Sequence, residues 1–452
     1  MTHHSQPTSS NPVLRFCFDN SVFLIAGTVV ALAWANWAHV NDSLSYQHFV
    51  EFDFASLWQS ESPSDTHMAT ENVAHVVAQG ETSHQGTVHA EESGHGHGLT
   101  LHFLVNDILM ALFFAIAAKE VWESLLPGGA LANPRKAITP LLATVGGVFG
   151  PALVYLCGAL ATGSLDTLGR GWAVPCATDI AFSYLVARFI FGNSHPAIAF
   201  LLLLAIADDA AGLVILAVFY PQAPIVPAWL LLTLVALLIT MVMRRRLRVH
   251  SHWWYIAIPG ALSWVSFYLA NIHPALGLVP IIPLLPHAHT DLGIFAKQEL
   301  LRHDTLSEFE AFWKKPVELM LGLFGLVNAG VVFGSVGTGT YLVLAGLLVG
   351  KPVGIVALTW FAEKVLRLEK PAGMTYQHVA TVGMVAGIGF TVALFVSIAA
   401  FSDPGAVRDS VKMGALLSFA AAPLAIAMGW VFKFRSVPTS ERLSSEVAAQ
   451  RV

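Results

Sequence analysis

The chain has 452 residues, of which 55% are apolar and only 12% are charged. Soluble globular chains carry about a quarter charged residues, and the mean hydropathy here is +0.64. This composition argues against a disordered chain, a fibre or a nucleic-acid-binding protein. The charged residues gather between apolar stretches of about twenty residues, the length of a membrane-crossing helix. The sequence therefore predicts an all-α polytopic membrane protein with little room for a soluble catalytic domain.

Apolar stretches of span length recur along the chain and predict about 12 transmembrane helices. They cover residues 21–40, 99–124, 137–162, 172–191, 196–219, 225–243, 253–271, 274–290, 316–336, 339–362, 377–400 and 410–432. The segment before the first stretch carries one basic residue, Arg15, and the stretch itself is long enough to span. We therefore expect an uncleaved first helix rather than a signal peptide.

The distribution of Lys and Arg predicts the orientation, because basic loops stay in the cytoplasm during insertion. With the N-terminus inside, twenty of the 24 basic residues fall on the cytoplasmic side. Arg170, Arg408 and Lys412 fall outside, and Lys351 falls within a span. We therefore predict a cytoplasmic N-terminal segment over 1–20, a transmembrane domain over 21–435 and a cytoplasmic tail over 436–452.

The loop over residues 41–98 has no Lys or Arg, nine acidic residues and seven histidines. It should face outward, and its second half, rich in Ser, Thr, Gly, Glu and His, should be mobile. A His-rich tract can bind a transition metal, but these histidines follow no ligand spacing, so we predict a solvated loop and no metal site. The three cysteines, Cys17, Cys157 and Cys176, are too few for a disulfide framework, and the sequence indicates no redox role and no cofactor.

A few ionisable residues lie inside predicted spans, where a charge costs several kcal/mol and normally marks a polar pathway. They are Asp107, Asp179, Asp208, Asp209 and Lys351. Glu120 and Glu318 lie nearer to span ends, where solvated positions are the simpler expectation.

The adjacent acids Asp208 and Asp209 are the most informative of these residues. Neighbouring helix residues project about 100° apart, so the two carboxylates should have different partners. A purely structural pair, neutralised by Lys351, is the alternative, but two consecutive buried acids double the desolvation cost without an obvious packing gain. Burial and a nearby ammonium act in opposite directions on a carboxyl group, and hard cations such as Na⁺ prefer oxygen ligands. The sequence thus predicts a site where H⁺ and Na⁺ compete, which is exchange if access alternates.

Two segments have the composition of interrupted helices. Pro175 and the small or hydroxyl-bearing residues after it precede Asp179, and the segment MVAGIGFTVALF contains Gly387, Gly389 and Thr391. Transporters often place such broken helices in corresponding positions of two inverted halves. Helix ends left in the membrane carry about half a charge each, so Asp179 suits the positive ends and Lys351 the negative ends. Ordinary glycine packing between helices is the alternative.

Four segments, in their order and spacing, resemble the signature of the NhaA-type bacterial sodium/proton antiporters. They are GWAVPCATDIAF, LAIADDAAGLVILAVFY, GLLVGKPVGI and AGIGFTVALF. The resemblance extends from about residue 21 to about residue 435. It implies an inverted-repeat fold with two broken helices that cross, and it makes residues 21–435 a transmembrane antiporter domain.

The resemblance also implies roles for individual residues. Asp209 matches the family's principal cation-binding carboxylate, and Asp208 matches its neighbour, which pairs with the intramembrane lysine, here Lys351. Asp179 and Thr178 match broken-helix positions that contribute to the cation and proton site and offset helix-end charge.

Two acids of the second span match the family's pathway residues: Asp107, and Glu120 at the cytoplasmic funnel, which the family uses in its response to pH. The resemblance implies electrogenic export of Na⁺ or Li⁺ in exchange for H⁺, for pH and sodium homeostasis, by a homodimer in the bacterial inner membrane. The chain departs from the family's usual G-L-E-V-K-R-E at the end of this span, because residues 118–124 read AKEVWES and lack the basic pair. We therefore carry over neither steep alkaline activation nor, given the long 41–98 loop, the usual dimer geometry.

Other functions are compatible with membrane-embedded carboxylates. A sodium-coupled symporter of an organic anion would use the same core with a larger polar cavity near Asp179. An intramembrane aspartyl protease would need two facing acids on different helices, such as Asp179 and Asp208, but the sequence lacks a G-x-G-D context. A sensor or scaffold that keeps the fold without transport is the remaining alternative. Antiport predicts a secondary transporter rather than an enzyme.

Overall fold

The computed structural model describes residues 18, 21–57, 100–129, 131–132, 134–192, 195–287, 304–368, 373–401, 403–432 and 434. In these ranges the chain is helical, and its β-structure is limited to one isolated bridge between Asp53 and Thr100. Most of the loop over 41–98, the segment 1–20 except Phe18, and the tail 436–452 lie outside the described residues, so the predictions made for them stay predictions.

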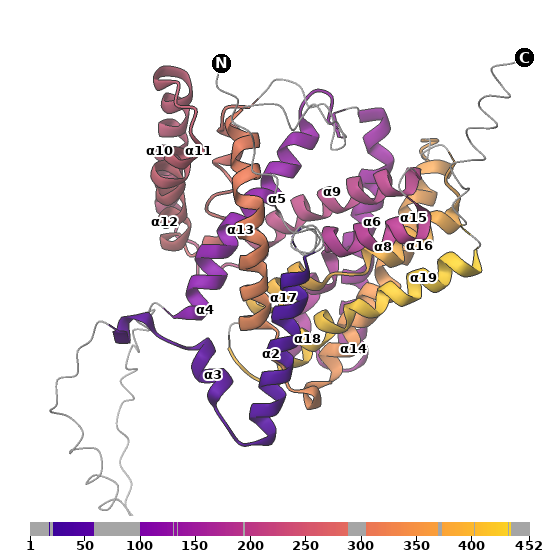
Figure 1. Ribbon diagram of the computed structural model, residues 1–452. Coiled ribbons are helices and arrows are strands. Elements are labelled where there is room, and N and C mark those ends of the chain that lie inside the picture. The colour runs from indigo at the N-terminus through magenta and orange to yellow at the C-terminus, as the bar shows by residue number, and fades with distance from the viewer. Residues whose placement is uncertain are drawn as a thin grey trace, which may run out of the picture.

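The helices are labelled in chain order, with η for 3₁₀ or π turns (Figure 1). The first half contains α2 (Val22–Val40), α3 (Ser45–Val50), η1 (Phe54–Leu57), α4 (Leu101–Phe103), η2 (Leu104–Leu109), α5 (Met110–Leu125), α6 (Pro134–Ala161), α7 (Leu165–Leu168), η3 (Gly169–Cys176), α8 (Ile180–Phe191), α9 (Pro196–Phe219), η4 (Pro227–Trp229), α10 (Leu230–Val242) and η5 (Met243–Leu247). The second half contains α11 (His252–Tyr255), η6 (Ile256–Gly260), α12 (Ala261–Leu269), η7 (Pro274–Leu276), η8 (Ile282–Leu284), α13 (Thr305–Asn328), η10 (Phe333–Ser335), α14 (Thr338–Ala345), η11 (Gly346–Gly350), α15 (Lys351–Lys364), α16 (Tyr376–Ala386), α17 (Phe390–Ala400), α18 (Ala406–Leu417), η12 (Ser418–Ala420) and α19 (Ala421–Val431).

Seven helical stretches in the described ranges are long and apolar enough to cross a membrane, and two bent helix pairs raise the number to nine if each pair is one span. Each of the nine coincides with a predicted apolar stretch. The predicted span 253–271 is also helical, as α11 to α12, and the predicted span 316–336 is helical as far as Asn328, where α13 ends. The helix α13 is less apolar than the nine, because three Glu and two Lys lie on it. The chain is therefore a multi-helix membrane protein, as predicted.

The predicted span 274–290 differs from the structure. Its described part forms two 3₁₀ turns, η7 and η8, joined by further turns in place of a continuous α-helix. The reason is in the sequence, because prolines recur at 274, 280, 283 and 286. Each proline removes a backbone donor and clashes with the preceding helical turn. Apolarity alone therefore overstates the regularity of this segment.

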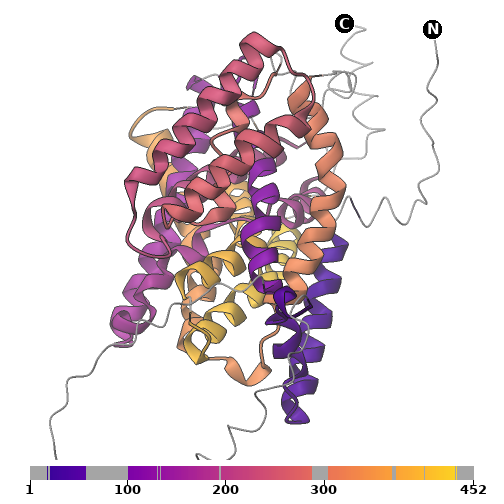
Figure 2. The same cartoon turned by 90° about the vertical axis from the view of Figure 1, so that its left-hand side faces the viewer.

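Both predicted helix interruptions are present. Between η3 and α8 the axis bends by 54°, and between α16 and α17 it bends by 53°. The two interruptions touch, since the N–H of Asp179 donates to the carbonyl of Ile388 at 2.7 Å. In Figure 1 the helices around this contact lie in the middle of the bundle, while α10, α11 and α12 form a group at its left edge that faces the viewer in Figure 2. Two broken helices thus meet inside the bundle.

Helices α6 and α15 cross with almost no side chain between them. A Cβ added to Gly354 would overlap the backbone carbonyl of Gly146, and one added to Gly150 would overlap that of Gly350. These glycines recur every four residues on each helix, the spacing that allows close approach in membranes. This contact holds α15, whose first residue is Lys351, against α6.

We therefore expect Gly354→Ala to lower stability by about 2 kcal/mol, the usual cost of forcing a methyl group into a packed interface. The measurement is the thermal unfolding temperature of the purified protein in detergent. Gly334→Ala is the matched control, because a Cβ there meets no atom within 4 Å. Equal unfolding temperatures for the two variants would contradict this interpretation of the crossing.

Candidate functional site

The structure brings Asp208 and Lys351 into direct contact. The Lys351 Nζ lies 3.1 Å from Asp208 Oδ2, and neither side chain is exposed. Thr178 Oγ1 lies 2.7 Å from the same carboxylate oxygen and 3.1 Å from the carbonyl of Ala386, so one hydroxyl proton serves two acceptors. Asp208 Oδ1 is buried without a hydrogen-bond partner in the described residues. One carboxylate of the adjacent pair is therefore held by an ammonium group on another helix.

Lys351 also binds a helix end. Its Nζ donates to the carbonyl of Cys176 at 2.6 Å, and Cys176 is the last residue of η3. Carbonyl ends of helices carry partial negative charge, so the ammonium faces one such end and one carboxylate together. The expectation that Lys351 offsets a negative helix end agrees with this contact.

Asp179 occupies the complementary position at positive helix ends. It is the N-cap of α8, and its carboxylate accepts the N–H of Phe182 at 3.4 Å. The same carboxylate accepts the N–H of Thr391 at 3.3 Å and the hydroxyl of Thr391, near the start of α17. A carboxylate between two helix N-termini is electrostatically favourable.

Asp209 follows Asp208 in α9 but is not held by the contacts described above. Its Oδ1 is buried and has no hydrogen-bond partner in the described part of the chain. Three other carboxylates act on it electrostatically, those of Glu120, Asp208 and Asp179, against the single ammonium of Lys351. More negative groups than positive ones therefore act on Asp209.

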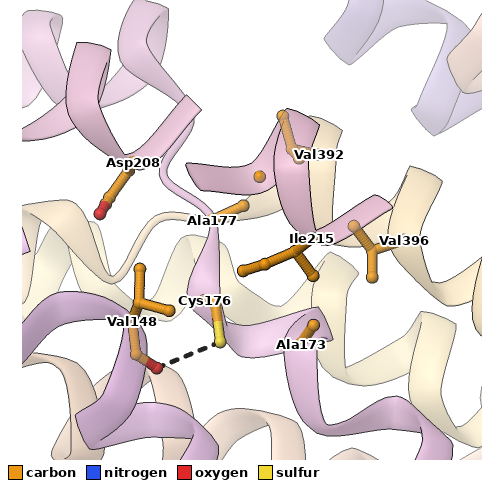
Figure 3. A pocket seen from close by; sticks show the side chains of 9 residues that line it. Val148, Ala173, Cys176, Ala177, Asp208, Ile215, Val392 and Val396 are labelled. Carbon is orange, nitrogen blue, oxygen red and sulfur yellow. Dashed lines mark hydrogen bonds between the residues drawn. The ribbon is translucent and has the colours of Figure 1, made fainter. Parts of the chain in front are cut away.

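A small cavity adjoins Asp208 (Figure 3). It is lined by Asp208 and by apolar or small residues that come mainly from η3, α9 and α17. Its volume of about 10 Å³ is room for roughly one water molecule. Among the described residues, no three His, Cys, Asp or Glu side chains are grouped to hold a metal ion.

The two acids of the second span lie apart from each other. Asp107 is buried on η2, with His273 Nδ1 at 3.7 Å from its Oδ1. Glu120 is half-buried on α5, between Asp209 and the charged groups of Lys119 and Glu310. Of the two, Glu120 is therefore the one in electrostatic contact with the site.

Sequence reasoning misses three partners at these positions. Thr391 lies in a segment predicted to break a helix, and its hydroxyl group was the available signal. His273 has no spacing signal, because it lies far from Asp107 in the chain and directly precedes a predicted span. The carbonyl of Cys176 could not be found from residue types, since every residue has one.

Glu318, expected at a solvated end, is half-buried and accepts the hydroxyl of Ser21 at 3.2 Å.

Comparisons with known proteins show which family the chain resembles. Residues 68–432 match the model of the family described as Na+/H+ antiporter 1. The chain is 48% identical to Na(+)/H(+) antiporter NhaA of Jannaschia sp. (strain CCS1), over 92% of this chain and 97% of that protein. It is 43% identical to the antiporter of the same name from Desulfitobacterium hafniense (strain DSM 10664 / DCB-2), over 96% of this chain and 100% of that protein. It is 44% identical to Na(+)/H(+) antiporter NhaA 2 of Pelobacter propionicus, over 94% of this chain and 99% of that protein.

A family match over most of the chain, together with relatives of this identity, identifies the family directly. The residues that carried the resemblance, including Asp208, Asp209 and Lys351, all fall inside the matched range. The chain belongs to the Na+/H+ antiporter 1 family.

Proposed function

We propose that the chain exports Na⁺ or Li⁺ across a bacterial inner membrane in electrogenic exchange for H⁺, in pH and sodium homeostasis. As a member of this family it is a secondary transporter, a Na⁺/H⁺ antiporter, and its substrates are Na⁺ and H⁺. The direction, the use of Li⁺ and the electrogenic coupling are the further parts of the proposal.

The observation that carries the mechanism is the unequal state of the adjacent acids. Asp208 is paired with Lys351 at 3.1 Å, whereas Asp209 has a buried oxygen without a hydrogen-bond partner among the described residues. Carboxylate oxygens are ligands that Na⁺ accepts, and a proton on the same oxygens removes them as ligands. Binding of Na⁺ and binding of H⁺ therefore exclude each other, which gives exchange when the site opens alternately to the two sides.

We assign residue roles on this basis. Asp209 and Asp208 bind the cation or the proton, with Thr178 and Asp179 completing the site. Lys351 compensates charge when the site is empty and takes part in proton coupling. Glu120 belongs to the cytoplasmic pathway and pH response because of its electrostatic contact with Asp209, and Asp107 belongs to the pathway on the other half of the second span.

The topology is part of the same proposal. About 12 membrane-crossing segments in two inverted halves, with 274–290 crossing in turns rather than as a continuous helix, would account for two broken helices that touch at their interruptions. Both termini would lie in the cytoplasm, with the transmembrane antiporter domain over 21–435 and an extracytoplasmic His-rich loop over 41–98. We further propose a homodimer in the lipid bilayer.

The alternative functions have less support. An organic-anion symporter needs a polar cavity for its solute, whereas the cavity beside Asp208 is lined mainly by apolar residues and holds roughly one water molecule. A protease needs two facing, available acids, whereas Asp179 is bound by Thr391 and Asp208 is bound by Lys351. The geometry therefore supports ion exchange over either alternative.

The test is exchange in proteoliposomes that carry a pH-sensitive dye and a proton gradient. Adding Na⁺ to acid-loaded vesicles should dissipate the gradient, and K⁺ at the same concentration serves as the ionic control. A membrane potential imposed with valinomycin should change the rate if exchange is electrogenic. Co-movement of Na⁺ and H⁺ in one direction, or no response to Na⁺, would contradict the proposed function.

A further inference from the structure

Four aromatic rings from four separate elements stack at the end of the bundle that leads into the C-terminal tail. Phe191 ends α8, His195 is the N-cap of α9, His378 lies in the first turn of α16, and Phe434 follows α19. The imidazoles are 4.9 Å apart and nearly parallel, at 25°. The ring of His378 stacks on Phe434 at 4.2 Å, and that of His195 stacks on Phe191 at 5.3 Å. We call this group the ring stack.

Each histidine also caps a helix through its Nδ1. The N–H of Ala197 donates to His195 Nδ1 at 3.1 Å, at the start of α9. The N–H of Thr375 donates to His378 Nδ1 at 3.0 Å, and the N–H of His378 donates back to Thr375 Oγ1 at 3.4 Å, at the start of α16. An Nδ1 that accepts an N–H carries no proton. Thr375 Oγ1 also lies 2.7 Å from His378 Nδ1. The capping bonds to the two Nδ1 atoms are those that neutral imidazoles accept.

The helices capped in this way are those that build the candidate site. Asp208 and Asp209 lie on α9, about 20 Å along the helix from its N-cap. The last residue of α16, Ala386, has the carbonyl that Thr178 can reach. The helix α8, which ends in Phe191, begins directly after its N-cap Asp179. The ring stack therefore joins the far ends of three helices whose other parts carry the cation site.

Protonation of the ring stack would act against all of these contacts. A proton on Nδ1 removes the acceptor of each capping bond. Two imidazolium rings 4.9 Å apart would repel each other. Each charge would also sit at a helix N-terminus, which is already the positive end of the helix dipole. These three effects have the same sign, so an acidic medium weakens the stack.

Few charged groups lie on the described elements around the stack. Of the elements packed around the stack, α9 carries no charged residue before Asp208, and α16 and α19 carry none. Arg188 near the end of α8 is positive. On α15, Glu363 lies 3.8 Å from Lys364 and accepts the hydroxyl of Tyr376 at 2.6 Å. Within the described residues, no carboxylate lies within 4 Å of the His378 ring nitrogens.

We propose that His195 and His378 are positioning residues that form a proton-sensitive clasp. The clasp is closed when both imidazoles are neutral, and it then holds the ends of α8, α9 and α16 together so that Asp208 and Asp209 keep their positions. Acidification opens the clasp and lowers the exchange rate. The effect on exchange rests on the proposed function, whereas the opening itself does not.

The test replaces both rings by residues that cap helices without titrating, in the double variant His195→Asn with His378→Gln. Asn is a preferred N-cap, and Gln at the third helical position returns a bond to the cap residue. At saturating Na⁺ the acid limb of the exchange rate should move about half to one pH unit lower, with the alkaline rate retained. The exposed His250→Gln is the matched control, since it removes one histidine ring away from the stack.

A second measurement is independent of transport. Backbone deuterium uptake near Ala197 and Thr375, corrected for intrinsic exchange, should rise about threefold or more between pH about 8 and about 5.5 in the natural chain, as expected when local capping is lost. The double variant should show no such rise. An unchanged acid limb, or equal uptake in the two proteins, would overturn the clasp. Absence of Na⁺ exchange would instead remove the proposed function, and the uptake comparison would still decide the clasp.

Discussion

Asp209→Asn is expected to reduce Na⁺-dependent proton movement in proteoliposomes by at least about 100-fold, because the amide keeps the shape of the side chain but can neither be deprotonated nor offer a charged oxygen to Na⁺. The protein should remain folded, since Asp209 Oδ1 has no hydrogen-bond partner to lose in the described residues. Removing the carboxylate that three others repel should even raise the unfolding temperature slightly. Loss of transport with retained stability is the signature of a ligand rather than a packing residue.

Asp166→Asn is the matched control for this prediction. Asp166 is an exposed acid in the short helix α7, so the same chemical change is made outside the site. The control should exchange Na⁺ at the rate of the natural chain. If Asp209→Asn exchanges as fast as Asp166→Asn, Asp209 is not the cation ligand, and the mechanism of mutual exclusion loses its central residue.

Local chemistry explains why the sequence could predict the helix interruptions. A proline before Asp179 and glycines at 387 and 389 weaken helix continuity by themselves, whatever surrounds them. The structure bends the chain at both places, by 54° and 53°. The same local rule applies to residues 274–290, where four prolines argue against a regular helix. A prediction from apolar composition alone ignores this backbone effect. The continuous helix predicted for residues 274–290 is therefore wrong.

Pairing across the bundle is less accessible to sequence reasoning. Intramembrane charge alone indicates that Lys351 needs a negative partner, but Asp179, Asp208 and Asp209 are all candidates. The family resemblance implies Asp208. Residue spacing alone does not, because the choice depends on the rotation of α9 relative to α15. The second partner of Lys351 is a backbone carbonyl, available because η3 ends at Cys176. The sequence therefore predicts the interruption that creates this acceptor and favours Lys351 for a negative helix end, but it does not specify the carbonyl of Cys176.

The ring stack is a second feature that sequence reasoning does not find. Neither His195 nor His378 lies in a motif that carried the resemblance, and both would be ordinary polar residues in a loop or first turn. Their significance comes from the 4.9 Å contact between helices that are far apart in sequence. Features outside the signature motifs are thus the ones that depend most on three-dimensional structure.

Lys351→Met is expected to lower the free energy of unfolding by about 3 to 5 kcal/mol, the usual cost of removing one partner from a buried ion pair. Met has nearly the length of Lys, so the loss reflects the uncompensated carboxylate of Asp208 rather than a cavity. The carbonyl of Cys176 also loses its donor. Thermal unfolding in detergent measures the change, and exchange in proteoliposomes should fall in parallel because the site is no longer held in place.

The double variant Lys351→Met with Asp208→Asn separates charge from packing. Removing the carboxylate as well takes away the unpaired charge, and replacing both members of a buried pair by neutral groups is often tolerated. Thr178 can still donate its hydroxyl proton to the amide oxygen that replaces the Asp208 carboxylate, or to the carbonyl of Ala386. We therefore expect the double variant to recover more than half of the stability lost by Lys351→Met without recovering exchange. If the double variant is as unstable as the single one, the ammonium acts chiefly on the helix end at Cys176, and the ion pair with Asp208 is secondary.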